Sequence, residues 1–259
     1  MKNTLCHYVS ACPLVLLPLF VYVQPAASEA LFEFSGSAEL ELTVYADNGL
    51  FPRQDYKSNA SVAVEPELYW EWNDGNDSVT FTPFVRADER DAERSHGDIR
   101  ELSWVRAGDL WEFRTGIRKV FWGVTEFTHL VDVINQTDSV DSFDGEEKLG
   151  QPMFNVSRVT DWGISDGFVL LGFRERTFAG RAARLRSGVI VDIERASFES
   201  SNEKEHVAYS LRWSHSVDVF DVGVYWFDGT DRIPIFQPQS IAGNVVLTPY
   251  YQQVSHWGV

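Results

Sequence analysis

Long alternation of apolar and polar residues is the feature that most limits what this chain can fold into. From residue 32 to residue 44 every even position is apolar or small, and the odd positions carry glutamate, serine or threonine. Because side chains alternate between the faces of a β-strand, such a strand has one apolar and one polar face. It exceeds the roughly 9–11 residues that a strand needs to cross a membrane. Residues 60–72 alternate in the same way, which predicts an all-β, antiparallel transmembrane β-barrel.

The first 28 residues have the features of an export signal. Lys2 precedes an apolar stretch over residues 5–23 that contains Pro13 and Pro18, and small residues follow at 26–28. The prolines and the small-residue end favour cleavage over a membrane anchor. We therefore predict a signal peptide at residues 1–28 and an outer-membrane domain at residues 29–259.

Composition excludes several classes of function. Both cysteines lie in the predicted signal, so the mature chain has neither a disulfide nor a thiolate metal site. The formal net charge of −16 disfavours nucleic acid, which proteins bind through clusters of lysine and arginine. With 44% hydrophobic and 14% aromatic residues, the chain is too apolar to be disordered. No cofactor is predicted.

The connections between the predicted strands alternate between long and short. About ten strands are expected, at residues 31–45, 60–72, 79–87, 99–107, 111–119, 154–162, 168–178, 207–215, 220–227 and 247–255. Short turns follow the second, fourth, sixth and eighth strands, as on the periplasmic side of outer-membrane barrels. Tryptophans near these turns suggest an interfacial girdle: Trp70, Trp72, Trp111, Trp162 and Trp213.

Some strands are irregular. Pro66 and Pro83 lie inside predicted strands, where a proline removes a hydrogen-bond donor and implies a bulge or an edge. Under strict alternation, Arg100 shares a face with Leu102 and Trp104, so the register of that strand stays open.

The polar faces are expected to line the lumen. There, opposed charges either create a transverse field across a water path or pair as a polar core, and both alternatives remain open. The predicted lumen-lining residues are Glu33, Glu39, Glu41, Glu65, Glu67, Glu71, Arg86, Arg114, Arg118 and Arg212.

The central segment contains the motifs. Residues 118–123 read Arg-Lys-Val-Phe-Trp-Gly, residues 132–138 Asp-Val-Ile-Asn-Gln-Thr-Asp, and residues 148–153 Lys-Leu-Gly-Gln-Pro-Met. In this order they resemble uncharacterised porin-like outer-membrane proteins of Gram-negative bacteria, often labelled a domain of unknown function. The resemblance implies a barrel in contact with outer-membrane lipid and the barrel-assembly machinery, and passive passage of small solutes. Members of that family are usually longer, which implies a truncated member with an incomplete barrel.

The long loop at residues 120–153 is expected to fold into the lumen as a constriction. Its apolar side chains need burial that a solvated loop does not provide: Phe127, Leu130, Val131, Val133 and Ile134. The loop also has an acidic cluster whose oxygens could bind calcium, although the spacing is not that of an EF-hand. Its members are Asp132, Asn135 and Asp138; we predict no metal site.

Two alternatives to a porin remain. Barrels of about ten strands are largely filled by side chains, whereas roughly 16 strands enclose an open channel, so a small closed barrel with a structural or binding role is one alternative. A soluble periplasmic β-sandwich that binds a ligand is the other. An enzyme is not expected, because no histidine or serine stands in a catalytic motif. The chain ends without the aromatic residue that usually terminates a barrel, which also predicts that the first strand lacks its partner.

Overall fold

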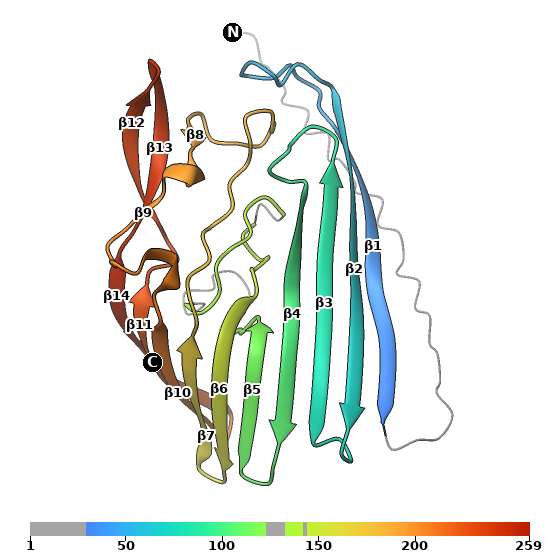
Figure 1. The fold of residues 1–259 in the computed structure, drawn as a ribbon, viewed down its shortest axis with the longest axis vertical. Coiled ribbons are helices and arrows are strands. Elements are labelled where there is room, and N and C mark those ends of the chain that lie inside the picture. Colours follow the sequence, from blue (N-terminus) through green and yellow to red (C-terminus); the bar gives the residue numbers. More distant parts are fainter. Residues whose placement is uncertain (1–29, 123–132, 142–143) are drawn as a thin grey trace.

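A single antiparallel sheet of ten strands dominates the fold (Figure 1). The computed structural model describes residues 30–122, 133–141 and 144–259; the predicted signal peptide lies outside them. In sheet order the strands are β1 (Leu31–Val44), β2 (Ser58–Trp72), β3 (Asp77–Asp88), β4 (His96–Ala107), β5 (Trp111–Arg118), β6 (Gln151–Thr160), β7 (Gly163–Leu170), β10 (Ala208–Val217), β11 (Phe220–Thr230) and β14 (Gln253–Gly258).

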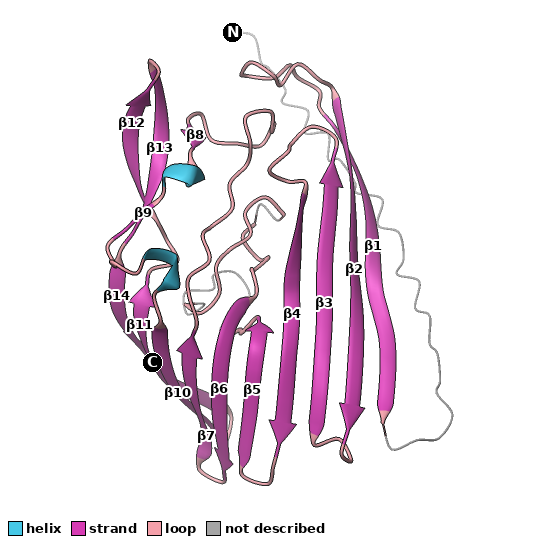
Figure 2. Cartoon of the chain, in the orientation of Figure 1, coloured by secondary structure: helices cyan, strands magenta, loops and turns pink. Residues whose placement is uncertain are grey.

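A small second sheet lies beside the large one. It consists of β12 (Ile235–Ile241) and β13 (Asn244–Tyr251), with the short strands β8 (Ile190–Val191) and β9 (Ser197–Phe198) parallel to β13. The only helices in the described chain are two 3-10 turns, η1 (Ile193–Arg195) and η2 (Glu203–Glu205) (Figure 2). Within the described ranges, no helix has the length and hydropathy needed to cross a membrane.

The all-β, antiparallel prediction is confirmed at the level of the sheet. Figure 1 shows a sheet that curls from β1 on one side to β11 and β14 on the other. Among the described residues β1 pairs only with β2, and β14 pairs only with β11. The sheet therefore has two edges here and is not a closed barrel.

Connections of different length lie at opposite ends of the sheet. The short turns at residues 73–76, 108–110, 161–162 and 218–219 gather at one end, the lower end in Figure 1. The long connections at residues 45–57, 89–95, 119–150, 171–207 and 231–252 leave the strands at the other end. This is the order that the sequence predicts.

The two faces of the sheet differ in chemistry. In β1 the even-numbered side chains are exposed, with Phe32 at 47%, Leu40 at 58% and Leu42 at 67%. We call this the outer face. The exposed apolar side chains continue across the sheet through Val64, Val85, Leu102, Phe113, Phe154, Leu211 and Phe220. The opposite, inner face is polar over β1 to β4, so the arrangement is the inverse of a sheet that packs its apolar face onto a core.

Proline places one inward side chain that alternation does not predict. Pro66 and Pro83 lie across from each other in a gap of the β2–β3 ladder, between the pairs Val64–Val85 and Leu68–Phe81. The β3–β4 register shifts between Thr82 and Pro83, as expected for a proline bulge. This shift turns Arg100 inward, where it is 1% exposed. Strict alternation, which would place Arg100 on the same face as Leu102, therefore does not hold in β4.

Two other predicted strands are misplaced. The strand predicted at residues 168–178 is β7, which begins at Gly163. Its glycines and polar residues resemble a turn, but Asp166 is an inner-face residue that accepts a hydrogen bond from Ser157. The strand predicted at 247–255 is divided between β13 and β14, which belong to different sheets. β12 lies in the predicted loop 228–246.

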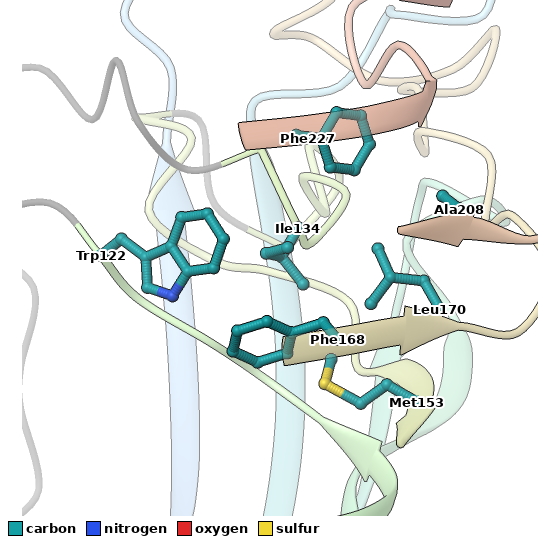
Figure 3. Packing of buried hydrophobic residues seen from close by; sticks show 7 residues of the cluster. All are labelled: Trp122, Ile134, Met153, Phe168, Leu170, Ala208 and Phe227. Carbon is teal, nitrogen blue, oxygen red and sulfur yellow. The ribbon is translucent and has the colours of Figure 1, made fainter. Parts of the chain in front are cut away.

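A cluster of apolar side chains covers the inner face over β6, β7, β10 and β11. Figure 3 shows this cluster, which consists of Trp122, Ile134, Met153, Phe168, Leu170, Ala208 and Phe227. Ile134 is 1% exposed, and Val133 packs against the cluster. The other loop residues for which burial is expected, Phe127, Leu130 and Val131, lie outside the described residues. The described part of the central segment therefore packs onto the inner face of the sheet.

Candidate functional site

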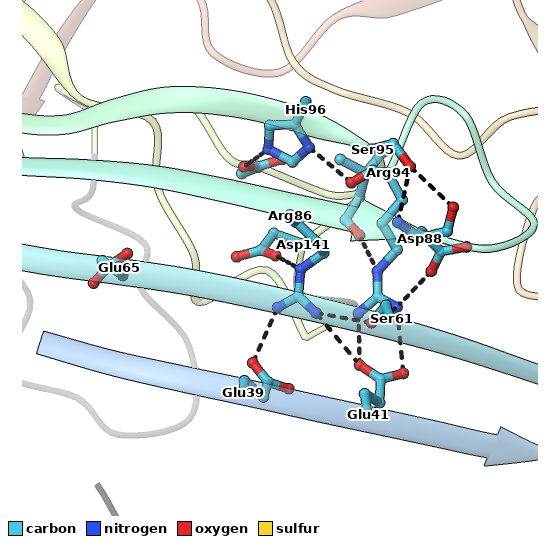
Figure 4. A network of polar contacts seen from close by, with 12 residues as sticks. Glu39, Glu41, Ser61, Glu65, Arg86, Asp88, Arg94, Ser95, His96 and Asp141 are labelled. Carbon is cyan, nitrogen blue, oxygen red and sulfur yellow. Dashed lines mark hydrogen bonds and ion pairs between the residues drawn. The ribbon is translucent and has the colours of Figure 1, made fainter. Parts of the chain in front are cut away.

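Three arginines of the β3–β4 hairpin form the centre of a polar network on the inner face, and Figure 4 shows two of them, Arg86 and Arg94, with their partners. Arg86 belongs to β3, Arg94 to the connecting loop and Arg100 to β4. Their carboxylate partners come from β1 and β2, from β3 and β4 themselves, and from residues 138–141 of the central segment. We call this group the inner ion-pair network. Its acidic members are Glu39, Glu41, Glu65, Asp88, Asp98, Asp138 and Asp141.

Arg86 joins β1 to the central segment. Its Nε donates to Asp141 Oδ1 at 2.6 Å, and its Nη2 donates to Glu39 Oε2 at 3.1 Å. Nη1 donates to Ser61 Oγ at 3.2 Å. Every nitrogen of this buried guanidinium therefore has an acceptor, which is the condition for a buried charge to be tolerated.

Arg100 holds the same segment from β4. Nη1 donates to Asp138 Oδ2 at 2.8 Å and Nη2 donates to Asp141 Oδ2 at 3.0 Å. The guanidinium also lies over the ring of Phe84, 4.1 Å from its centroid. Both carboxylates are almost completely buried, so these pairs are shielded from water and salt.

Arg94 fixes the segment through its backbone. Nε donates to the carbonyl oxygen of Val140 at 3.0 Å, while Nη2 donates to Glu41 at 2.7 Å and Nη1 to Asp88 at 3.2 Å. Burial lowers the pKa of Arg94, but hydrogen bonds and charges from Glu41 and Asp88 outweigh it and raise that pKa above its ordinary value. The arginine is thus charged at neutral pH.

Asp138 is a fully buried carboxylate that binds three side chains: Arg100, His96 and Thr177. Thr177 Oγ1 donates to its Oδ1 at 2.7 Å, and His96 Nε2 lies 3.3 Å from Oδ2. Burial by itself raises the pKa of Asp138, but the hydrogen bonds from His96 and Thr177 and the charge of Arg100 together hold it well below its usual range. The group is ionised at neutral pH and joins β4 to the chain between β7 and β10.

A second polar group lies on the inner face of β5, β6 and β10. Arg114 donates to Ser157 Oγ at 3.1 Å and forms an ion pair with Glu112. Arg118 donates to Asn155 Oδ1 at 3.3 Å, and Arg212 lies 5.7 Å from the ring centroid of Trp122. These arginines have mostly neutral neighbours.

All ten residues predicted to line a lumen lie on the inner face, as the strand register shows. Only some of them meet. Glu39 and Glu41 pair with Arg86, and Glu65 lies 3.9 Å from Arg100. In the described chain, no ion pair joins Glu33, Glu67 or Glu71 to Arg114, Arg118 or Arg212.

Arg94 and Arg100 are not among the residues that the sequence predicts to face inward. Arg94 lies in a connection, for which strand alternation makes no prediction. Arg100 is turned inward by the bulge at Pro83, and that proline is the one signal from which its orientation could have been inferred.

The predicted acidic cluster of the central segment is divided. Asp132 lies outside the described residues. Asn135 accepts from the backbone N–H of Val120 at 2.7 Å and donates to the carbonyl oxygens of Arg118 and Leu149 at 2.8 and 2.9 Å. The Asn135 amide therefore joins the two ends of the central segment, whereas Asp138 belongs to the inner ion-pair network. Among the residues that the structure describes, no group of three or more acidic, histidine or cysteine side chains is arranged to hold a metal ion.

No known protein family, curated protein or solved structure significantly matches this chain. Its role has to be inferred from the chemistry of the two faces. The network pairs three buried arginines with carboxylates of the strands and of the central segment, which suits it to holding that segment in place.

Proposed function

We propose that this chain is a porin-like outer-membrane protein that lets small solutes pass by diffusion and performs no enzymatic chemistry. The observation on which the proposal rests is the inversion of the two faces. An apolar surface that extends over nine strands is far larger than the few hundred Å² that soluble monomers usually expose. Hydrocarbon is the environment in which such a surface is stable.

The ends of the sheet support the same proposal. Short turns at one end and long connections at the other match the asymmetry of outer-membrane barrels. Trp70, Trp111 and Trp162 are exposed close to the short turns, where interfacial tryptophans would contact lipid headgroups. The signal peptide predicted at residues 1–28 would deliver the chain across the inner membrane.

The central segment would then narrow the passage. Residues 133–141 are held on the inner face by Arg86, Arg94 and Arg100. In a barrel this position corresponds to a constriction, and solute passage would depend on the space that the segment leaves. The buried network also favours a second candidate, a closed barrel without an open pore, because its charges are paired and its side chains occupy the inner side.

Fractionation and conductance test the proposal. The full chain, expressed in a Gram-negative host, is expected in the outer-membrane fraction and to show a compact, heat-modifiable band on a gel. Purified protein in a planar bilayer is expected to conduct, and Arg114→Glu should raise the cation-to-anion permeability ratio because Arg114 is on the inner face. Recovery in the soluble periplasm would contradict a membrane role. A heat-modifiable protein that never conducts would support the closed barrel.

A further inference from the structure

Basic residues concentrate in one connection of this acidic chain. The connection between β7 and β10 holds Arg174, Arg176, Arg181, Arg184 and Arg186 within 13 residues, against a net charge of −16. Arg174 forms an ion pair with Asp98, at 2.8 Å. None of the other four arginines forms an ion pair with a described residue. The stretch at residues 174–186, which contains five arginines and a single glutamate, is therefore a local concentration of positive charge.

Two of these arginines line one cavity, which we call the arginine cavity. Its volume is about 210 Å³. Arg176, Arg186 and Ser139 supply its polar wall, and Phe178, Leu185 and Val189 supply its apolar wall. No aspartate or glutamate of the described chain lines it. The cavity is outside the inner ion-pair network and combines positive charge with an apolar surface.

Arg176 is held with its terminal nitrogens free. Nε donates to Ser139 Oγ at 2.7 Å, and the backbone N–H donates to the Tyr251 hydroxyl at 3.2 Å. The next residue, Thr177, is fixed by its hydrogen bond to Asp138. Nη1 and Nη2 form no hydrogen bond with described residues, yet they are not sealed from solvent. They remain available as a fork of donors in a fixed position.

The charge and burial of Arg176 favour the binding of an anion. Burial lowers the pKa of Arg176 because desolvation of the guanidinium is not offset by a carboxylate. Arg186 adds a second charge to the cavity; its guanidinium lies over the ring of Phe51, 4.0 Å from the centroid, and Nη1 donates to the Ser187 carbonyl at 2.7 Å. An anion bound here would replace the solvation that the Arg176 guanidinium lacks.

We propose that the arginine cavity binds a small organic carboxylate. The carboxylate would accept two hydrogen bonds from Arg176, and the apolar part would lie against Phe178, Leu185 and Val189. The volume is below the roughly 300–1,000 Å³ of pockets for drug-sized ligands, so the ligand is a small acid. This inference rests on the proposed function, because the small carboxylate would be a solute that enters the proposed passage.

Benzoate is the probe, and neutral benzamide is its matched control. Calorimetry on the full chain in detergent is expected to show benzoate binding at least tenfold tighter than benzamide, because charged hydrogen bonds are the stronger ones. Arg176→Gln should weaken benzoate binding tenfold or more, and Arg176→Lys less, because lysine keeps the charge without the fork. Arg181→Gln, an exposed change in the same connection, should leave the affinity unchanged.

Equal binding of benzoate and benzamide would overturn the inference, as would an unchanged affinity in an Arg176→Gln protein that retains the wild-type circular dichroism spectrum. Inorganic phosphate should bind more weakly than benzoate, because it lacks an apolar part; equal affinity would contradict the role of the apolar wall. The measurement does not require a pore. Conductance without benzoate binding would refute this inference alone, whereas benzoate binding without membrane insertion would refute the proposed function alone.

Discussion

Replacement of Arg100 by methionine tests whether the inner ion-pair network holds the central segment in place. Methionine fills similar space without the charge. The change removes the 2.8 Å pair with Asp138 and the 3.0 Å pair with Asp141. Breaking a buried ion pair costs about 3–5 kcal/mol, because the remaining charge stays buried. We expect about 3 kcal/mol, since His96 and Thr177 still bind Asp138, and Arg86 still binds Asp141.

The measurement is urea unfolding of the refolded full chain, followed by tryptophan fluorescence, with the free energy of unfolding extrapolated to water. Arg106→Met is the matched control. Arg106 lies on the same strand, but its side chain is 56% exposed, and its Nη1 lies 3.5 Å from Asp77 Oδ2, a longer distance than in the Arg100 pairs. It should cost less than about 1 kcal/mol.

A double-mutant cycle separates the ion pair from general packing. Asp138→Asn removes the charge that Arg100→Met leaves behind, so the double variant should be at least about 1 kcal/mol more stable than the sum of the single effects predicts. Additive effects, or a cost of Arg100→Met no greater than that of Arg106→Met, would refute the reasoning.

Three further expectations follow from the glycines, the outer face and the buried acid. Gly116→Ala should cost about 1–3 kcal/mol in unfolding experiments, because φ is +126° and a Cβ would collide with the Leu102 carbonyl oxygen; Gly243→Ala, with φ of +79° but open space around it, should cost less. Leu102→Arg on the outer face should reduce stability in vesicles by about 2–4 kcal/mol, whereas Leu50→Arg, in a connection and 87% exposed, should be neutral. The pKa of Asp138 is lower in the folded protein than in the unfolded chain. Its contribution to the free energy of unfolding is therefore complete above the unfolded pKa of about 4 and is lost as the pH falls toward the folded pKa. The stability of Asp138→Asn should fall less than that of the wild type between about pH 5 and pH 2.

Strand alternation predicts the two faces of β1 and β2 well, because it depends only on neighbours along the chain. The same rule fails at β4, where the bulge at Pro83 changes the phase and turns Arg100 inward. It also fails at β7, where glycines and polar inner-face residues resemble a turn. In each case tertiary context determines the phase of the strand.

Local sequence patterns do not predict which charged residues pair in the inner ion-pair network. Asp138 and Asp141 are visible as acids in a long loop, for which calcium is one interpretation. Their partners are arginines 38 to 55 positions away. Alternation and spacing contain no information about which distant charges meet, so the sequence predicts the composition of the inner face but not its pairs.

The separation of these contacts along the chain implies an order of folding. Most ladders of the large sheet join strands that are neighbours in the sequence, and four of these hairpins close through turns of two to four residues. The contacts to the long connections join residues as far as 137 positions apart, the longest between Arg184 and the Asp47 carbonyl oxygen. Because long loops are entropically slower to close, the hairpins would form first. Arg86 and Arg100 would then lack their partners Asp138 and Asp141 until the central segment packs onto the sheet, so docking of this segment would be a late step of folding.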